Sequence, residues 1–134
     1  MNLRSVLEFR FTVYAGLAQA CTGAPKPDCF NVPAKFKRIY KIDFAQADAD
    51  GFVKKVGYID LMDIDDPKGV AKQGGKNGKL TFPFFTIENV DVVDADHIIV
   101  GNDNNLPFSS GRALGKSDDN ELIILKVTDL LKAK

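Results

Sequence analysis

The sequence predicts an all-β fold made of antiparallel sheets that resemble the blades of a β-propeller. Apolar residues recur at every second position in most periodic segments, which is the period of a half-buried strand. Short clusters of Gly, Pro, Asn and Asp separate these segments, as turns separate antiparallel neighbours. The chain also shows no convincing pattern for a long helix. Together these observations favour a partial propeller of two to three blades.

The first strand is predicted close to the amino terminus. Every second residue from Leu7 to Val13 is apolar, and the residues between them are mostly polar. The charged residues Glu8 and Arg10 also disfavour a cleaved signal peptide here, although Ala18-Gln19-Ala20 has the form of a cleavage site. We therefore interpret this segment as a half-buried strand.

Further strands are expected in five segments, which are Phe36–Phe44, Phe52–Leu61, Thr86–Val93, His97–Gly101 and Glu121–Val127. In the first of them, Phe36, Arg38 and Tyr40 fall on one side of the strand. The turn-forming segments 47–51 and 94–96 would connect neighbouring strands as hairpins. The segments 68–79 and 102–120 are expected to be exposed loops.

The carboxyl-terminal segment Thr128–Lys134 is expected to form a short helical turn, with Leu130 and Leu131 facing inward. A chain of 134 residues suits one domain, which we place at residues 1–134. A complete propeller has at least about four blades of up to four strands each. The chain is therefore expected to be part of a propeller whose other blades are missing, to complete one as a homo-oligomer, or to adopt a different small β fold.

Charge and cysteine content limit the possible partners. Eighteen basic residues balance eighteen acidic ones, so nothing attracts nucleic acid or a membrane surface in general, and no apolar run is long enough to span a bilayer. Cys21 and Cys29 enclose a loop rich in turn formers, so we expect a disulfide between them, which would imply an oxidising compartment. Two unpaired cytosolic thiols are the alternative.

The densest polar cluster is Gly101-Asn102-Asp103-Asn104-Asn105, directly after an apolar strand. Such a run is typical of a turn, but its oxygens also suit Ca²⁺ or Mg²⁺. Glu88 lies between apolar residues of a neighbouring strand, where a carboxylate is expected to be paired, protonated or metal-bound. Glu88 and the amide-rich cluster could therefore converge on one ion. A solvent-facing Glu88 on an edge strand remains the alternative.

Other polar residues have two interpretations each. Arg112 could hold a phosphate or carboxylate, or anchor its loop to Asp118 or Asp119. Glu121 could cap the site, pair with Arg112, or simply begin the last strand. The lone histidine, His97, is more simply explained as a strand residue than as part of a catalytic triad. The acidic turn Asp63-Ile64-Asp65-Asp66 is expected to be solvated.

The same residues resemble the family described as esterase-like activity of phytase. The resemblance rests on segments 81–84, 86–90, 99–105, 110–112 and 119–123, and covers roughly Phe36–Val127. It implies a periplasmic or extracellular β-propeller that hydrolyses phosphoester or ester bonds. Members are generally longer, so the resemblance also implies that this chain is the carboxyl-terminal part. The functional residues it implies are Glu88, Asn102, Asp103, Asn104, Arg112 and Glu121.

The resulting hypothesis is a hydrolase for small phosphoester or ester substrates that uses a divalent ion, expected to be Ca²⁺. The ion would be held by Glu88, Asn102, Asp103 and Asn104. Asp103 would also be the general base, Arg112 would neutralise charge that develops on the substrate, and Glu121 completes the expected catalytic set. The alternative is a non-catalytic calcium-binding or protein-interaction module.

Overall fold

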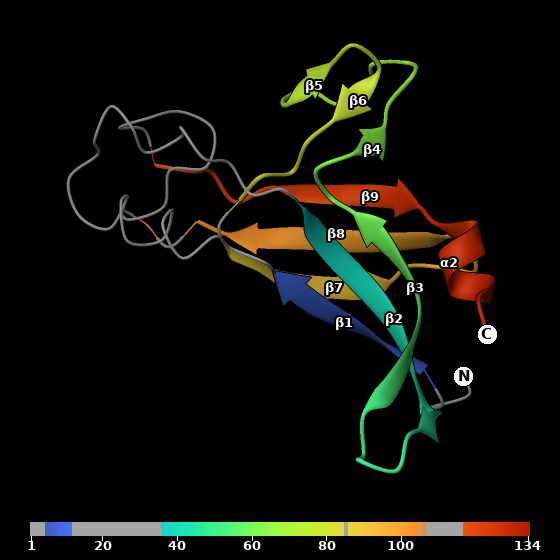
Figure 1. The fold of residues 1–134 in the computed structure, drawn as a ribbon. Coiled ribbons are helices and arrows are strands. Elements are labelled where there is room, and N and C mark those ends of the chain that lie inside the picture. The colour runs from blue at the N-terminus through green and yellow to red at the C-terminus, as the bar shows by residue number, and fades with distance from the viewer. Residues whose placement is uncertain (1–4, 12–35, 85, 105, 107–116) are drawn as a thin grey trace.

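The computed structural model describes residues 5–11, 36–84, 86–104, 106 and 117–134. These residues form nine strands and one short helix, and the strands make three antiparallel sheets of three strands each (Figure 1). The predicted all-β, antiparallel, blade-like fold is confirmed, and the sheets do not close into a barrel. No helix in the described part of the chain is long and apolar enough to cross a membrane.

Sheet A contains the strands β1 (Ser5–Phe11), β2 (Lys37–Ala47) and β3 (Val53–Asp60), in that order. All three agree with strands that the apolar alternation predicts, although residues 12 and 13 of the first lie outside the described residues. In β2 the alternation buries Ile39 completely, opposite Ile59 of β3. Arg38 and Tyr40 consequently lie on the opposite, outer face of the sheet.

Sheet C contains β7 (Thr86–Val92), β8 (His97–Asp103) and β9 (Leu122–Lys126), with β8 in the centre. β8 buries Ile98, Val100 and Asn102 on one face. It continues for two residues past Gly101, so the prediction that a loop begins at Asn102 was wrong. β7 contains a bulge, because Ile87 pairs with Asn102 whereas Asn89 pairs with Gly101, which leaves Glu88 as the extra residue.

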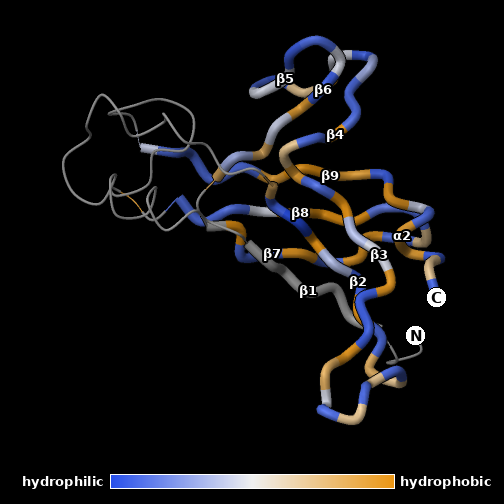
Figure 2. Tube along the Cα trace, viewed as in Figure 1, coloured by the Kyte–Doolittle hydropathy of each residue, from blue (hydrophilic) through white to orange (hydrophobic). Residues whose placement is uncertain are grey.

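The inner faces of sheets A and C enclose one hydrophobic core. Phe82 and Phe84 lie in the connection between the sheets and pack edge to face, with ring centroids 4.8 Å apart. Figure 2 shows that hydrophobic residues are concentrated in sheet C. Burial of this apolar surface is the main force that holds the two sheets together. The core consists of Ile39, Leu61, Phe82, Phe84, Ile87, Ile98, Val100, Leu125, Val127 and Leu130.

The small sheet B projects from one end of this two-layer body (Figure 1). It consists of β4 (Ile64–Asp65), β5 (Gly75–Lys76) and β6 (Lys79–Leu80), with β6 in the centre. The expectation of about six strands missed these three. β5 and β6 are joined by Asn77 and Gly78, which both have positive φ angles, 54° and 76°, as a type I′ hairpin turn requires.

The acidic segment Asp63-Ile64-Asp65-Asp66, which contains β4, is less solvated than expected. Asp66 is buried, and its carboxylate accepts hydrogen bonds from the backbone amides of Val70 at 2.8 Å and Ala71 at 3.0 Å. Asp63 and Asp65 are exposed, as expected, but both form ion pairs with Lys79, at 2.9 and 2.7 Å. These contacts order the glycine-rich segment that leads into the hairpin.

The chain ends in the short helix α2 (Thr128–Lys132), which confirms the predicted helical turn. Leu130 is buried in the core and Leu131 packs against it, both as predicted. Lys41 of β2 donates hydrogen bonds from Nζ to the carbonyl oxygens of Leu131 at 2.6 Å and Ala133 at 2.9 Å. This cation at the helix carboxyl terminus joins α2 to sheet A.

Candidate functional site

Asn102 lies at the centre of the predicted site, and it points inward with only 6% of its surface exposed. Its Oδ1 accepts a hydrogen bond from the backbone amide of Glu121 at 2.7 Å. Its Nδ2 donates to the carbonyl oxygen of Asp119 at 3.0 Å. Both ends of the side chain therefore hold the segment before β9 against β8.

Asn104 also takes part in loop structure. Its backbone amide donates to Oδ1 of Asn120 at 2.9 Å, and its own Oδ1 accepts a hydrogen bond from the backbone amide of Leu106 at 3.2 Å. Asparagine side chains that bind backbone two residues on are typical of turns. The contacts of Asn102 and Asn104 fit the turn-forming interpretation of the amide-rich cluster.

Glu88 lies on the other face of sheet C. The bulge resets the alternation of β7, so that Ile87 and Val90 face the core while Glu88 and Asn89 are exposed. Glu88 lines a groove of about 420 Å³ on the outer face, together with Gly101 and Leu122. The structure therefore does not bring Glu88 and Asn102 into a common pocket where they could converge on one ion. It agrees with the alternative, a solvent-facing Glu88 on an edge strand.

We call the two hydrogen bonds that the Asn102 side chain makes to the backbone of Glu121 and Asp119 the Asn102 clamp. Asp103 and Glu121 lie next to it. Asp103 is half-buried and follows Asn102 at the end of β8, and Glu121 is half-buried and bound through its backbone amide. The same segment carries Asp118, which is buried. Asp103, Asp118 and Glu121 therefore all lie near one end of sheet C in the chain. Arg112, Cys21 and Cys29 lie outside the described residues.

A calcium site would need more ligands than these positions offer. Ca²⁺ takes about six to eight oxygen ligands. In the part of the chain that the structure describes, no three His, Cys, Asp or Glu residues are placed to hold a metal ion. Asn102 Oδ1 is already engaged by a backbone amide. The described residues therefore do not fit a calcium ion as a complete ligand set.

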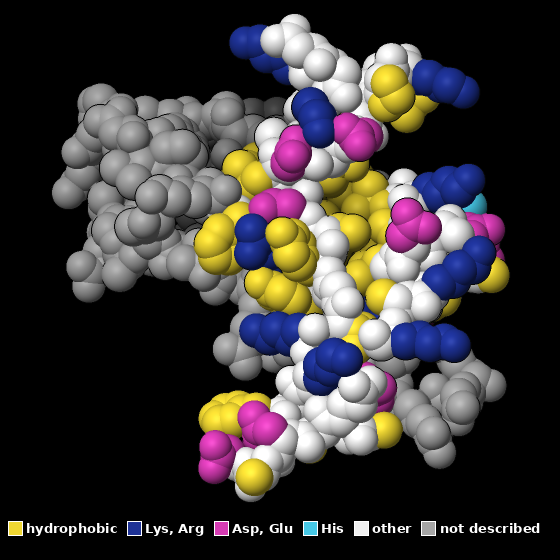
Figure 3. All heavy atoms as spheres, turned by 45° about the vertical axis from the view of Figure 1, so that its right-hand side comes forward, with side chains coloured by type: hydrophobic (Ala, Val, Ile, Leu, Met, Phe, Trp, Pro, Cys, Tyr) yellow, Lys and Arg dark blue, Asp and Glu magenta, His cyan; other side chains and the backbone are white. Residues whose placement is uncertain are grey.

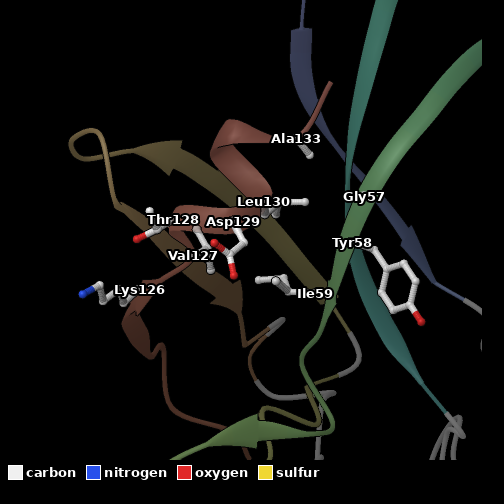
Figure 4. A pocket seen from close by; sticks show the side chains of 9 residues that line it. All are labelled: Gly57, Tyr58, Ile59, Lys126, Val127, Thr128, Asp129, Leu130 and Ala133. Carbon is white, nitrogen blue, oxygen red and sulfur yellow. The ribbon is translucent and has the colours of Figure 1, made fainter.

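A larger groove lies elsewhere, between the edge strand β3 and helix α2, with a volume of about 650 Å³ (Figure 4). It is lined mainly by backbone and apolar side chains such as Ile59 and Leu130, with Lys126 and Asp129 as charged members. None of the predicted site residues within the described segments lines it. It offers no group that the hydrolysis hypothesis uses.

His97 has a structural role in the turn between β7 and β8. Its Nδ1 lies 2.9 Å from Oδ1 of Asp94, which also accepts hydrogen bonds from the backbone amides of Asp96 and His97. The hydrogen bond from the Asp96 amide, with that from the His97 side chain, lowers the pKa of Asp94. This arrangement agrees with the interpretation of His97 as an ordinary strand residue.

The sequence interpretation missed a stack of rings and cations on the outer face of sheet A. The Arg38 guanidinium lies between the rings of Phe36 and Tyr58, 4.3 and 4.2 Å from their centroids. Lys55 Nζ lies 4.5 Å from the ring centroid of Tyr40. The available signal was that Phe36, Arg38 and Tyr40 share one side of the predicted strand.

The three antiparallel sheets define the class of the protein, which is an all-β protein of blade-like sheets. Within that class, the family model described as esterase-like activity of phytase matches residues 21–106. The match spans most of the chain, and the chain belongs to this phytase-like family. No curated protein and no solved structure matches the chain.

Proposed function

We propose that the chain is a phytase-like hydrolase domain that acts on small phosphoester or ester substrates. The observation that supports this proposal best is the Asn102 clamp, which holds the backbone of Glu121 against the end of β8, where Asp103 lies, in a member of this family. Ordered carboxylates at a strand end can exchange protons with a bound substrate.

In this proposal Asp103 acts as the general base. It accepts a proton from the water that attacks phosphorus or the acyl carbon, and the bond to the leaving oxygen breaks as that oxygen takes up a proton. Glu121 is the second carboxyl group and is proposed to supply that proton. Arg112 is proposed to neutralise the negative charge that develops on the substrate oxygens.

The role of a divalent ion is part of the proposal. Ca²⁺ remains the ion of choice because carboxylate and amide oxygens are hard ligands. Asp103 and Asn104 are the positions where such an ion would be sought first, with Glu88 and Asn102 as the other predicted ligands. Further oxygens beyond the described residues would be needed, so no step of the proposed reaction depends on the ion.

Turnover of aryl phosphates and aryl esters by the full chain, with and without added calcium, tests the function. We expect Asp103→Asn to lower kcat by about 10²–10⁴, the usual contribution of a general base. Asp50→Asn, at an exposed carboxylate in the β2–β3 turn, is the matched control and should retain activity. Equal activity of the two variants would contradict the proposed role of Asp103.

A second candidate is the non-catalytic module that binds calcium or another protein. Its non-catalytic character is favoured by Asn102, whose carboxamide binds backbone on both sides, and by the position of Glu88 on the opposite face, because neither side chain then serves a common reaction centre. Calcium binding without turnover, unchanged by Asp103→Ala, would support this candidate and exclude the hydrolase.

We also propose that the protein works in the periplasm or outside the cell, with a disulfide between Cys21 and Cys29. An oxidising compartment is where such a short disulfide loop persists. Thiol titration of the protein isolated without reductant from its natural compartment is the test. No free thiol is expected, and two reactive thiols would contradict the disulfide.

A further inference from the structure

The outer face of sheet C is apolar where it meets solvent. β9 reads Leu-Ile-Ile-Leu, and while Ile123 and Leu125 face the core, Leu122 is 70% exposed and Ile124 is 64% exposed. Strands that are buried on both faces have such continuous apolar runs, whereas a sheet with one solvated face alternates. Figure 2 shows the same continuous hydrophobic character along β9. This face therefore has the composition of a covered surface.

A groove of about 420 Å³ lies on this face. Leu122 lies across Gly101, where a Cβ atom would be only 2.7 Å from Leu122 Cδ2. Gly101 and Ile99 form the floor of the groove on this face. On the β7 side the groove is bordered by the exposed carboxylates of Glu88 and Asp91. The outer face of sheet C is consequently apolar along β9 up to its last residue, the exposed Lys126, and acidic on the β7 side.

The same chain carries a surface of complementary character on the outer face of sheet A. Tyr58 is 52% exposed there and lies beside Tyr40, with ring centroids 5.6 Å apart. Arg38 and Lys55 lie over these rings, and Arg38 also pairs with Asp60 at 3.5 Å. Figure 3 shows hydrophobic side chains directly beside cationic ones on the surface of the molecule. Tyr and Arg are the residue types that most often contribute binding energy in protein interfaces.

We propose that the outer face of sheet C binds the outer face of sheet A of a second copy of this chain. The apolar residues Leu122 and Ile124 would pack on the tyrosine rings, and the carboxylates of Glu88 and Asp91 would face Arg38 and Lys55. Sheets A and C pack through their inner faces, so their outer faces point away from each other. The contact is therefore heterologous, and copies add head to tail, forming a ring if the rotation closes.

The mass of the full chain in solution is the first measurement. Sedimentation equilibrium up to about 100 μM protein should show masses that are multiples of 14.7 kDa, with weaker association at high salt. A single species of 14.7 kDa over this range would overturn the proposal and leave the face to a different partner.

Two variants, each altering one face, separate this contact from others. Ile124→Lys alters the sheet C face and Tyr58→Glu alters the sheet A face, and each alone should weaken association at least about tenfold. Val70→Lys, at an exposed apolar residue outside both faces, is the control and should associate like the wild type. Circular dichroism establishes that each variant is folded.

A mixture of the two variants gives the sharpest result, because each retains one intact face. The expected product is a 1:1 heterodimer that does not grow further. Self-association of Tyr58→Glu alone, at the strength of the wild type, would show a symmetric contact and overturn the proposal.

An exchange of charges between the two faces is the second test, which can be made even if Ile124→Lys does not fold. In it Asp91→Lys and Lys55→Glu should each weaken association, and their mixture should restore it, whereas unchanged association in all three would refute the pairing.

Discussion

Asn102 and Glu121 are joined by two hydrogen bonds that connect β8 to the start of β9. The side-chain Oδ1 of Asn102 accepts a hydrogen bond from the backbone amide of Glu121 at 2.7 Å. The backbone amide of Asn102 donates one to the carbonyl oxygen of Glu121 at 3.3 Å. The side-chain Nδ2 adds a third bond, to the Asp119 carbonyl oxygen. A single buried carboxamide therefore continues the pairing of two strands beyond the point where regular pairing ends at Leu122.

Replacement of Asn102 by Leu should lower the free energy of unfolding. The change leaves the Glu121 amide and the Asp119 carbonyl without their side-chain partner, at about 1–3 kcal/mol for each group that stays buried. Urea unfolding measures the loss, and Asn89→Leu at an exposed position of β7 is the control. If Asn102 served as a calcium ligand instead, the difference in the free energy of unfolding between the wild type and Asn102→Leu would depend strongly on added calcium.

The strands were predictable because their alternation reflects one buried face, as in β2, where Ile39 is buried between the outward-facing Arg38 and Tyr40. The convergence of Glu88 with Asn102 was not predictable in the same way. One extra residue in β7 reverses which side chains face outward, and a bulge leaves no periodic signal in so short a strand. Sheet B was missed because strands of two residues have no measurable period.

Lys41→Met should loosen helix α2. Lys41 Nζ binds two carbonyl oxygens at the end of a helix of only five residues, whose amino terminus has no side-chain cap. Loss of a partly exposed, charged donor at this position should cost about 1–2 kcal/mol. Amide exchange at Leu131 and Ala133, whose backbone amides donate to the carbonyl oxygens of Val127 and Leu130, should then be about tenfold faster. Lys54→Met, at an exposed residue of β3, should leave these exchange rates unchanged.

Two glycines of the β5–β6 hairpin should differ in their tolerance of alanine. Gly78 has a φ of 76°, where an L side chain is strained by about 1 kcal/mol or more. Gly75 has only ordinary contacts of 3.5 Å or longer around an added Cβ. Gly78→Ala should therefore increase proteolytic cleavage in segment 67–80, and Gly75→Ala should not. Equal cleavage of both variants would show that the type I′ turn does not determine the order of this hairpin.

Burial of Lys37 should make the stability of the fold vary with pH in the alkaline range. It is buried in β2, and burial lowers its pKa from 10.5 to about 8. Between these two values the unfolded chain holds the proton and the folded chain does not, so stability attributable to Lys37 rises with pH from about 8 to 10.5. Below pH 8 both states carry the charge, and the folded state bears the cost of its desolvation.

Lys37→Met should consequently be more stable than the wild type at pH 7, by about 1–3 kcal/mol, because one pKa unit corresponds to about 1.4 kcal/mol. The advantage should shrink as the pH approaches 10, where the folded wild type is already neutral at this position. Urea unfolding at pH 7, 8, 9 and 10 measures the trend, and Lys76→Met in the exposed hairpin controls for general titration. An advantage that stays constant across this range would show that Lys37 keeps its proton in the folded protein, and that a neighbouring group compensates its charge.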